Sequence, residues 1–427
     1  MKSVLYCLLL ISLHSCVDAQ HSAYSMENKG LACDALINGN GEMLMTGEIS
    51  SQDIAQSEKP IKSGLISVLK YGSEDGHQFI LSDGANPFRI DQCENSNEGI
   101  LFSGYGLESK KPLIFLCDKN MKLKWAKVSD QLQPLGKPFL CANAKGESMI
   151  ATRLPSSTAY YNYFTLTDKV GKEIWTKRLD HIDVLSDIIY STADQFLIHF
   201  VAKGAYIEER KKYYNLPLIR CNTKGISENS FVMHIDRDVY PQITSNKILE
   251  ASNGDLYFFG SLSNVEKRMD LLVIKTTAKG ELLWSKAYQT NKDLEIKSAM
   301  FDENQDIIFV ADSYGRKGGF LYVRMNKEGL IQTNDFHETK PFEQVKKILN
   351  NRDKKILFYD KVLNFAFIEY SKDHSCSGMQ IEIKSSPIEV LIYKEPQMME
   401  DADLSWRHQE LSIKEKGKYK LKQDCVK

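Results

Sequence analysis

Two short strands joined by a polar turn that ends in glycine recur along this chain, and the repeat constrains the fold more than any other feature. The clearest copy is residues 271–288, LLVIKTTAKGELLWSKAY. Other copies begin at Leu65, Leu113, Tyr163, Leu216, Leu321 and Phe365. One repeat position holds the turn glycines: Gly76, Gly171, Gly225, Gly280, Gly329 and Gly378, with Met121 in their place in the second copy. Glycine suits a tight hairpin because it adopts positive φ without steric cost.

A second hairpin precedes each copy, and its second strand is rich in apolar residues. These strands begin at Met43, Ile100, Ser148, Phe196, Leu256, Ile307 and Ile356. They recur about every fifty residues, the spacing of four-stranded propeller blades. We therefore predict an all-β fold, a seven-bladed β-propeller of four-stranded blades over residues 20–386.

The apolar pattern argues against other repeat folds. Apolar residues cluster in short runs between Gly and Asn, without the i, i+3, i+4 spacing of helical solenoids. A pair of β-sandwiches would not repeat one strand-turn-strand phrase seven times. Closing the sheets into a ring also covers their apolar faces. Trp125, Trp175 and Trp284 occupy one repeat position, which predicts packing between blades.

The phrase resembles the repeats of secreted bacterial β-propeller proteins, related loosely to WD40-like and quinoprotein-like propellers. The resemblance spans about Cys33 to Ile383. It implies the fold but no single activity, because this group includes binding proteins, lyases and scaffolds. The chain lacks a motif that matches the quinoprotein active site, so no cofactor is expected.

The first nineteen residues have the pattern of an export signal. Lys2 precedes an apolar run over 4–13, too short to span a hydrocarbon core of about 30 Å. Residues 17–19 (VDA) place small side chains at the cleavage positions, which predicts a mature start at Gln20. The alternative is a lipoprotein whose first residue is a lipidated Cys16. We expect a secreted or periplasmic protein, or one anchored at the cell surface by that lipid alone.

Seven cysteines follow the signal, and an odd number leaves at least one free thiol. Four lie at repeat positions that hold Leu, Met or Thr in other copies: Cys93, Cys117, Cys141 and Cys221. These are predicted to be buried packing residues. Cys376 and Cys425 are the candidates for a disulfide that would fix the C-terminus. Without a C-x-x-C pair, no metal site is expected.

The repeat ends after Ile383, and residues 387–427 form a separate tail with up to three candidate strands and a Lys-rich end. Strands at a chain end often complete a propeller blade and close the ring. We expect the tail to do this or to form a small extra sheet at the rim.

Ligand-binding residues are expected on loops whose length varies between repeats. Tyr160, Tyr161, Tyr206 and Arg210 are expected on such loops at one end of the ring. Aromatic faces next to Arg stack on sugar rings or hold a polar polymer. The alternative is that these tyrosines pack at strand edges or face solvent.

Three histidines, His181, His234 and His337, lie near the predicted connections between blades, beside acidic residues. If the connections converge near the central channel, these side chains would bind a metal or act as acid and base. Scattered surface histidines fit the sequence better, because no H-x-x-x-H spacing is present. His199 lies within an apolar run and is predicted to belong to the core.

The charge balance limits the classes of partner. With 55 basic and 56 acidic residues, the formal net charge is -1, so no nucleic-acid partner is expected. The sequence favours a non-catalytic binding or scaffolding propeller that recognises a protein or glycan on one ring face. The alternative is an enzyme, a polysaccharide lyase or glycoside hydrolase with its site at the channel mouth.

Overall fold

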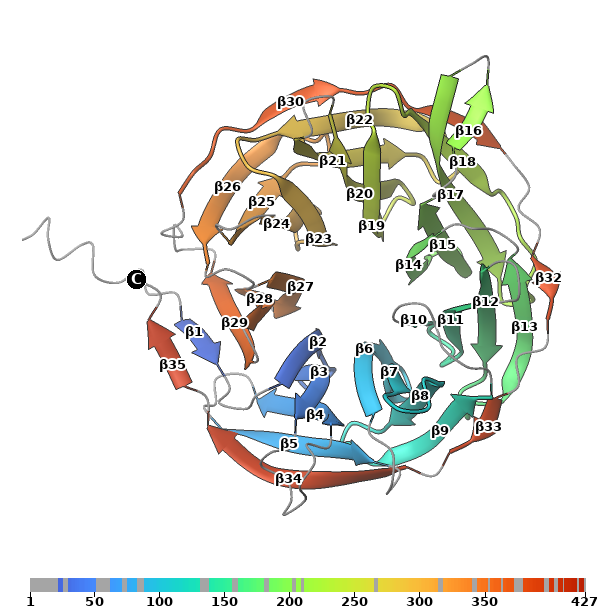
Figure 1. The fold of residues 1–427 in the computed structure, drawn as a ribbon, viewed down its shortest axis with the longest axis vertical. Coiled ribbons are helices and arrows are strands. Elements are labelled where there is room, and N and C mark those ends of the chain that lie inside the picture. The colour runs from blue at the N-terminus through green and yellow to red at the C-terminus, as the bar shows by residue number, and fades with distance from the viewer. Residues whose placement is uncertain are drawn as a thin grey trace, which may run out of the picture.

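The computed structural model contains β-strands and no helix in the residues that it describes (Figure 1). Those residues are 22–25, 30–50, 62–70, 75–82, 88–130, 138–155, 160–179, 184–201, 205–208, 211–264, 268–313, 318–339, 344–351, 354–361, 364–371, 379–394, 399–402, 406–409, 411–420 and 422–425. Within these ranges there is no helix long and apolar enough to cross a membrane.

Seven antiparallel sheets surround a central channel (Figure 1). The innermost strands are β2 (Gly30–Ile37), β6 (Phe88–Ser96), β10 (Phe139–Ala142), β14 (Val184–Tyr190), β19 (Gln242–Glu250), β23 (Leu294–Phe301) and β27 (Gln344–Asn351). Each contacts the innermost strand of the next sheet, and β27 contacts β2, so the ring is closed. The prediction of an all-β propeller is confirmed. Below, a sheet is named by its innermost strand.

Three further strands extend each sheet outward from the channel. The second strands are β3 (Glu42–Ser50), β7 (Gly99–Gly106), β11 (Ser148–Pro155), β15 (Gln195–Val201), β20 (Leu256–Ser263), β24 (Ile307–Ser313) and β28 (Lys354–Lys361). The third strands are β4 (Lys62–Lys70), β8 (Pro112–Cys117), β12 (Tyr160–Thr167), β17 (Lys211–Asn222), β21 (Met269–Thr276), β25 (Gly319–Met325) and β29 (Asn364–Ser371). The fourth strands are β5 (Asp75–Ser82), β9 (Leu123–Ser129), β13 (Glu173–Leu179), β18 (Phe231–Asp236), β22 (Leu282–Gln289), β26 (Ile331–Glu338) and the N-terminal β1 (Ser22–Ser25). A short strand, β16 (Ala205–Glu208), pairs only with β17.

The core consists of apolar layers between neighbouring sheets. Successive side chains of a strand point to opposite faces, so each strand contributes to two layers. In β20, Phe258 packs in the layer toward the β14 sheet, whereas Tyr257 and Phe259 pack in the layer toward the β23 sheet. This is why the second strands read as continuous apolar runs in the sequence.

Three repeated tryptophans each join their own sheet to the next one, as predicted. The indole Nε1 of Trp175 donates to Thr223 O at 2.9 Å, in the turn between β17 and β18 of the following sheet. Trp125 and Trp284 make the same contact, to Lys169 O and Lys327 O, each at 3.3 Å.

The turn glycines adopt positive φ and also leave room for a side chain of the preceding sheet. Gly171 has φ of 77°, and a Cβ atom there would lie 2.6 Å from the Trp125 ring. Met121, which replaces glycine in the second copy, also has positive φ, 64°. Gly76 was assigned to the same position wrongly, because it lies inside β5, opposite Leu69. Gly378 lies outside the described residues.

The prediction of four-stranded blades is corrected by the C-terminal segment, residues 379–425, here called the belt. Its strands add an outer strand to six of the seven sheets: β30 (Lys384–Pro387), β31 (Leu391–Lys394), β32 (Glu400–Asp401), β33 (Trp406–His408), β34 (Ser412–Lys420) and β35 (Lys422–Cys425). On the remaining sheet, Met379 bridges Phe336 of β26. The belt covers edges that would otherwise expose unpaired backbone groups.

The belt runs around the ring in the direction opposite to the sheets. It passes from the β23 sheet through the β19, β14, β10, β6 and β2 sheets, and ends on the β27 sheet (Figure 1). There β35 pairs with β1, which pairs with β29. Both ends of the described chain therefore complete one sheet, and the described belt strands join existing sheets instead of forming an extra one.

Candidate functional site

Six of the seven innermost strands contain a β-bulge near the point where they enter the sheet. An extra residue in one strand bends it locally and redirects a side chain. The bulged residues are Cys33, Asp91, Ser186, Asn246, Lys297 and Lys346. They share a position in the repeat but not a residue type.

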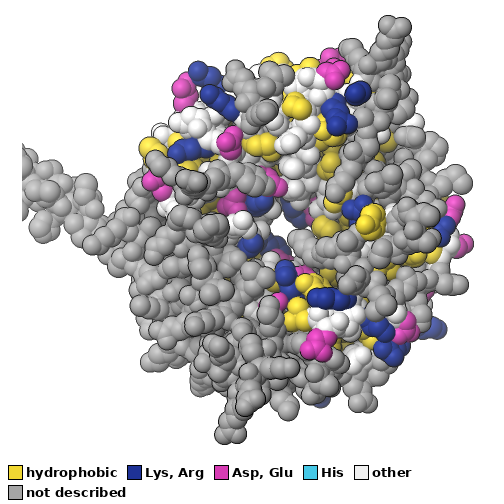
Figure 2. All heavy atoms as spheres, viewed as in Figure 1, with side chains coloured by type: hydrophobic (Ala, Val, Ile, Leu, Met, Phe, Trp, Pro, Cys, Tyr) yellow, Lys and Arg dark blue, Asp and Glu magenta, His cyan; other side chains and the backbone are white. Residues whose placement is uncertain are grey.

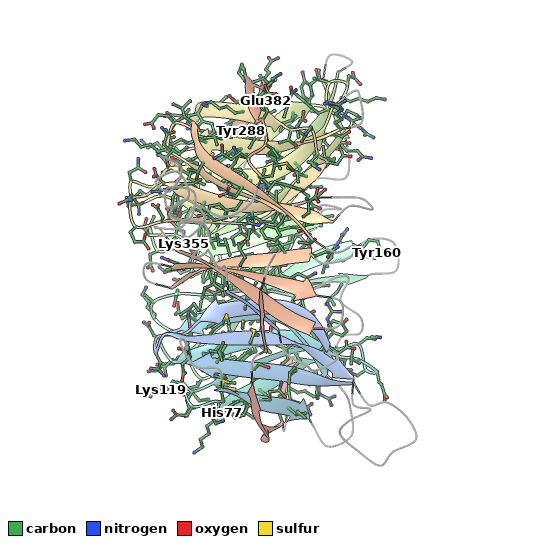
Figure 3. All side chains as sticks on the ribbon, turned by 90° about the vertical axis from the view of Figure 1, so that its left-hand side faces the viewer. His77, Lys119, Tyr160, Tyr288, Lys355 and Glu382 are labelled. Carbon is green, nitrogen blue, oxygen red and sulfur yellow. The ribbon has the colours of Figure 1, made fainter. Side chains whose placement is uncertain are left out.

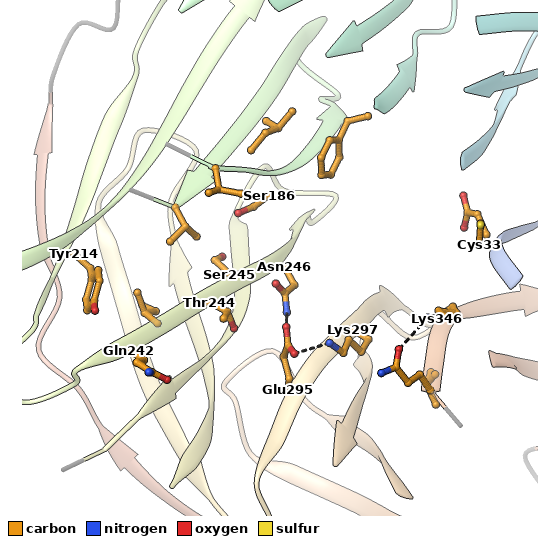
Figure 4. Close-up of a pocket in the computed structure, with 18 residues that line it drawn as sticks. Cys33, Ser186, Tyr214, Gln242, Thr244, Ser245, Asn246, Glu295, Lys297 and Lys346 are labelled. Atoms are coloured by element: carbon orange, nitrogen blue, oxygen red, sulfur yellow. Dashed lines mark hydrogen bonds and ion pairs between the residues drawn. The ribbon is translucent and has the colours of Figure 1, made fainter. Parts of the chain in front are cut away.

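A cavity of about 820 Å³ opens where these bulges meet, at the mouth of the channel. Five bulged residues line it, namely Cys33, Ser186, Asn246, Lys297 and Lys346 (Figure 4). Its wall also contains the apolar side chains of Phe139, Val201 and Tyr214. Figure 2 shows the opening at the centre of the ring, with charged side chains of both signs around it. The site is thus assembled from several sheets.

Side chains next to the bulges bind the backbone of the following sheet and fix the inner strands. Four such hydrogen bonds are Cys93 N to Asp34 Oδ2 at 3.0 Å, Leu140 N to Gln92 Oε1 at 2.9 Å, Ile248 N to Asp187 Oδ2 at 3.0 Å and Ile348 N to Ser298 Oγ at 3.2 Å. Two ion pairs reinforce them, Lys347 with Asp34 at 3.0 Å and Lys247 with Asp187 at 2.8 Å. Burial alone would lower the pKa of Lys347, but Asp34 raises it above its usual value, so this lysine is charged. The cavity therefore has a rigid wall.

Glu295 is the centre of a polar group in the cavity wall. Its Oε2 accepts a hydrogen bond from Lys297 Nζ at 2.5 Å, and its Oε1 accepts one from Asn246 Nδ2 at 2.9 Å (Figure 4). Asn246 comes from the neighbouring sheet and also donates to Ile296 O at 2.6 Å. These contacts hold the carboxylate in one orientation.

Asp312 lies opposite Glu295 in the register of β23 and β24, so both side chains are on the same face of the sheet. Asp312 is 6% exposed, its Oδ1 accepts from Val345 N at 2.9 Å, and its Oδ2 has no hydrogen-bond partner among the described residues. Burial raises the pKa of Asp312 to about 6, although Lys297 and Lys346 oppose that rise. One buried carboxyl group thus titrates near neutral pH next to the site.

Asp312→Asn tests whether Asp312 titrates near pH 6, because the substitution changes how the stability of the protein depends on pH. The folded-state pKa of about 6 exceeds the unfolded value of about 3.9, so the folded chain keeps a proton that the unfolded chain loses. The wild-type contribution to stability is therefore present below about pH 4 and is lost as pH rises to 6. Relative to wild type, the Asn variant should gain about 2 kcal/mol in the free energy of unfolding between pH 4 and pH 7, measured by urea unfolding. A constant difference across that range would contradict the assignment.

The measurement compares the unfolding free energies of wild type and Asp312→Asn, because His199 changes stability with pH in the direction opposite to Asp312. This histidine is fully buried, and its core position was predicted correctly. Burial lowers its pKa to about 4. Its neutral ring donates from Nδ1 to Pro217 O at 3.1 Å and accepts at Nε2 from Ser245 Oγ at 2.7 Å. Both proteins contain His199, so its contribution cancels in the comparison.

Cys33 is the thiol at the cavity, but it is a poor nucleophile. Burial raises the pKa of Cys33 to about 12, and the nearby Arg89 offsets only part of that rise. A protonated thiol is unreactive at neutral pH. Arg89 itself forms an ion pair with Asp91 at 2.7 Å. The other described cysteines within the repeats are buried and free, as predicted: Cys93, Cys117, Cys141 and Cys221.

The tyrosines predicted to bind ligand lie in strands, not loops. Tyr160 and Tyr161 begin β12, where Arg153 and Arg178 lie over their rings at 5.1 and 4.9 Å. Tyr160 projects at one end of the ring (Figure 3). Tyr206 lies in β16, opposite Tyr213.

Of the tyrosines whose side chains are described, Tyr214 lines the cavity, whereas Tyr160 and Tyr161 do not. Arg210 lies outside the described residues. A ligand-binding role for these residues stays a prediction.

The described histidine candidates are on outer strands. His234 lies in the fourth strand β18 and is buried against Tyr213 and Tyr393, with ring centroids 5.7 and 4.8 Å away. His337 lies in the fourth strand β26 and stacks on Phe320. The structure therefore does not bring these two histidines together at the channel.

Two other predictions cannot be placed. His181 and Cys376 lie outside the described residues, so neither the third histidine nor the predicted disulfide of Cys376 with Cys425 is located. Among the described residues there is also no group of three or more His, Cys, Asp and Glu side chains that could hold a metal ion.

Fold and site together define a β-propeller with a cavity of mixed polar and apolar lining at its channel mouth. No family model and no curated protein matches the chain. Among solved structures, it is similar to a polysaccharide lyase at 12% identity, with a TM-score of 0.49 and coverage of 79% of this chain and 89% of that one.

Two further similarities are lower. An ulvan lyase is 9% identical, with a TM-score of 0.44 and coverage of 83% of this chain and 95% of that one. A protein of unknown function from Bacteroides caccae is 12% identical, with a TM-score of 0.37 and coverage of 65% and 94%. At these values the similarities assign neither a substrate nor a residue role to this chain.

Proposed function

We propose that this protein is an exported binding propeller that holds a glycan at the mouth of its central channel. The observation that carries the proposal is the cavity of about 820 Å³ lined by bulged residues from several sheets. Ligand sites are concave, occur where structural units meet, and contain a few converging polar groups. Side chains on rigid strands hold such groups in place better than loops do.

The cavity wall suits a ligand with many hydroxyl groups. Gln242, Thr244, Asn246 and Gln344 offer amides and a hydroxyl. The Thr244 hydroxyl is buried from solvent and has no hydrogen-bond partner in the part of the chain that the structure describes. A polar atom in that state is uncommon unless a ligand or water completes it. Phe139 and Tyr214 supply apolar surface for a sugar ring.

A second candidate function is hydrolysis or elimination on a polysaccharide, and the pair of Glu295 and Asp312 favours it. Glycosidases use two carboxyl groups in different protonation states, one as acid and one as base or nucleophile. Here Lys297 and Asn246 bind the carboxylate of Glu295, and burial raises the pKa of Asp312 to about 6. Asp312 is not part of the cavity wall, so binding remains the primary proposal.

A glycan array probed with the chain from Gln20 onward tests both functions. Thr244→Tyr should fill the cavity and lower glycan affinity at least about tenfold by displacing the ligand. Thr333→Tyr is the matched control, because Thr333 is exposed on the outer strand β26.

Mass analysis of each bound glycan then shows whether it is cleaved. Cleavage that is lost in Asp312→Asn would replace binding with catalysis as the function. Equal binding by the two tyrosine variants would place the site elsewhere. Export, with or without lipid on Cys16, belongs to the proposal, and the mass of the mature N-terminus tests it.

A further inference from the structure

One of the two lysines in the cavity wall has no ion-pair partner among the described residues. Its wall contains two carboxylates and two lysines, namely Asp34, Glu295, Lys297 and Lys346. Asp34 is paired with Lys347, which lies behind the wall, and Glu295 is paired with Lys297. Lys346 donates only to the Gln344 amide oxygen, at 3.1 Å, and no carboxylate of the described chain lies within ion-pair distance of it. The ammonium group of Lys346 is therefore open to an anionic ligand, although its charge also acts on the buried Asp312.

The position of Lys346 is fixed by the backbone. It is the bulged residue of β27, and Lys297 is the bulged residue of the adjacent β23. Asp312 lies in the β23 sheet and Cys33 in β2. Burial raises the pKa of both groups, and the positive charge of Lys346 offsets part of each rise. Its charge therefore acts between the β23 and β2 sheets, and Figure 4 shows Lys346 between Lys297 and Cys33.

A half-buried charge interacts with an anion more strongly than an exposed one, because the surrounding protein has a lower effective dielectric than water. Gln344, held beside the ammonium by their hydrogen bond, adds two amide N–H donors for an oxygen anion. The uncharged polar groups around them, Thr244 and Asn246, fit the hydroxyls of a sugar better than an apolar peptide side chain.

We propose that the ligand is an acidic saccharide whose carboxylate or sulfate group is bound by Lys346 and Gln344 at the channel mouth. The inference rests on the proposed function and names the ligand class of that same site. The shared chemistry is one anionic oxygen group on a sugar, and the two sources, uronate and sulfate ester, are separated by the probes below.

Isothermal titration of the full mature chain tests the inference with three tetrasaccharide probes: a galacturonate oligomer, a sulfated galactose oligomer and neutral cellotetraose. At least one acidic probe should bind about tenfold or more tightly than the neutral one, and its affinity should fall as salt is raised. Lys346→Gln should abolish that preference, and Lys346→Arg should restore most of it.

Lys327→Gln is the matched control. Lys327 is 73% exposed in the hairpin between β25 and β26, at the opposite end of its sheet from the bulges. It should leave all affinities unchanged. Melting temperatures of the variants within about 2 °C of wild type would show that a loss of binding is not a loss of folding.

The outcomes separate this inference from the proposed function. Suppose that neutral and acidic probes bind with equal affinity and that Thr244→Tyr abolishes the binding of both. That result would support the binding site but contradict the proposed anion site. The same holds if Lys346→Gln retains the acidic preference. Binding of an acidic peptide without any saccharide would overturn the ligand class, and no binding of any probe at the cavity would overturn both proposals.

Discussion

Removing residues 379–427 is expected to prevent cooperative folding of the whole ring. The deletion takes the outer strand from six sheets and the Met379 bridge from the seventh. It also removes β35, which pairs with β1, the N-terminal strand that completes the β27 sheet. Because the sheets bury their apolar faces only against each other, loss of closure at one sheet exposes its neighbours as well.

The belt also contributes side chains to the core. Ile388 and Val390 are 8% and 5% exposed and pack in the layer between the β14 and β19 sheets. The backbone around Ile388 is held by Ser285, whose hydroxyl donates to Ile388 O at 2.6 Å and whose carbonyl accepts from Ile388 N at 3.2 Å. Edge pairing and burial therefore act together in the belt.

Circular dichroism melting and size-exclusion chromatography of the truncated chain provide the measurement. We expect no cooperative melt and a larger apparent size. Ile388→Ala in the full chain is a graded version, with an expected loss of about 2–4 kcal/mol in the free energy of unfolding. Glu389→Ala is its control, since the neighbouring side chain is exposed. A truncated chain that melts like the full one would show that the belt is dispensable.

The repeat carried most of the information about the fold. The positions of Trp175 and of the turn glycine Gly171 were predictable because each blade must offer the same surface to the next. Both residues do lie in contacts across the boundary between two sheets. The belt was less predictable. It follows the repeat in the sequence but has none of its periodicity, and its short strands exist only because the outer edges are there to pair with.

The cavity lined by bulged residues could not be predicted from the sequence, for a physical reason. A bulge adds one residue to a strand, and in the sequence that residue looks like any other member of the alternation. The bulged residues range from Cys33 to Lys346 in chemistry, so no motif connects them. Histidine and tyrosine side chains can act in binding and catalysis, but their aromatic rings are also good packing groups. His234 and His337 are both in contact with other rings on outer strands.

The sequence does contain one signal of the bulges, which is a glycine inside some of the second strands. Glycine in a strand often marks a bulge or a close approach of two backbones. Gly104 and Gly260 each lie opposite the residue that precedes a bulge. A Cβ atom on Gly104 would lie 1.8 Å from Arg89 O. These two glycines let the innermost strand approach the second strand closely at the bulge, and at Gly260 the extra residue, Asn246, lines the cavity.

Gly260→Ala should therefore destabilise the protein and disturb the site together. The new Cβ would lie 2.0 Å from Thr244 O and 3.0 Å from the Cα of Ser245, both of which are backbone atoms of β19. A backbone cannot move aside as the end of a side chain can, so we expect a loss of about 3 kcal/mol or more in the free energy of unfolding. Moving Ser245 also breaks its hydrogen bond to the buried His199, and Asn246 loses its direction into the cavity.

Urea unfolding and glycan affinity of this variant should be compared with those of Gly39→Ala. A methyl group added to Gly39 would have no heavy atom within 4 Å, and the residue lies in an exposed turn. The control should therefore change stability by no more than about 0.5 kcal/mol. If Gly260→Ala has wild-type stability and binds ligand normally, the close approach of β20 to β19 does not create the site. If stability falls but the remaining folded protein binds with full affinity, the bulge at Asn246 serves the fold alone.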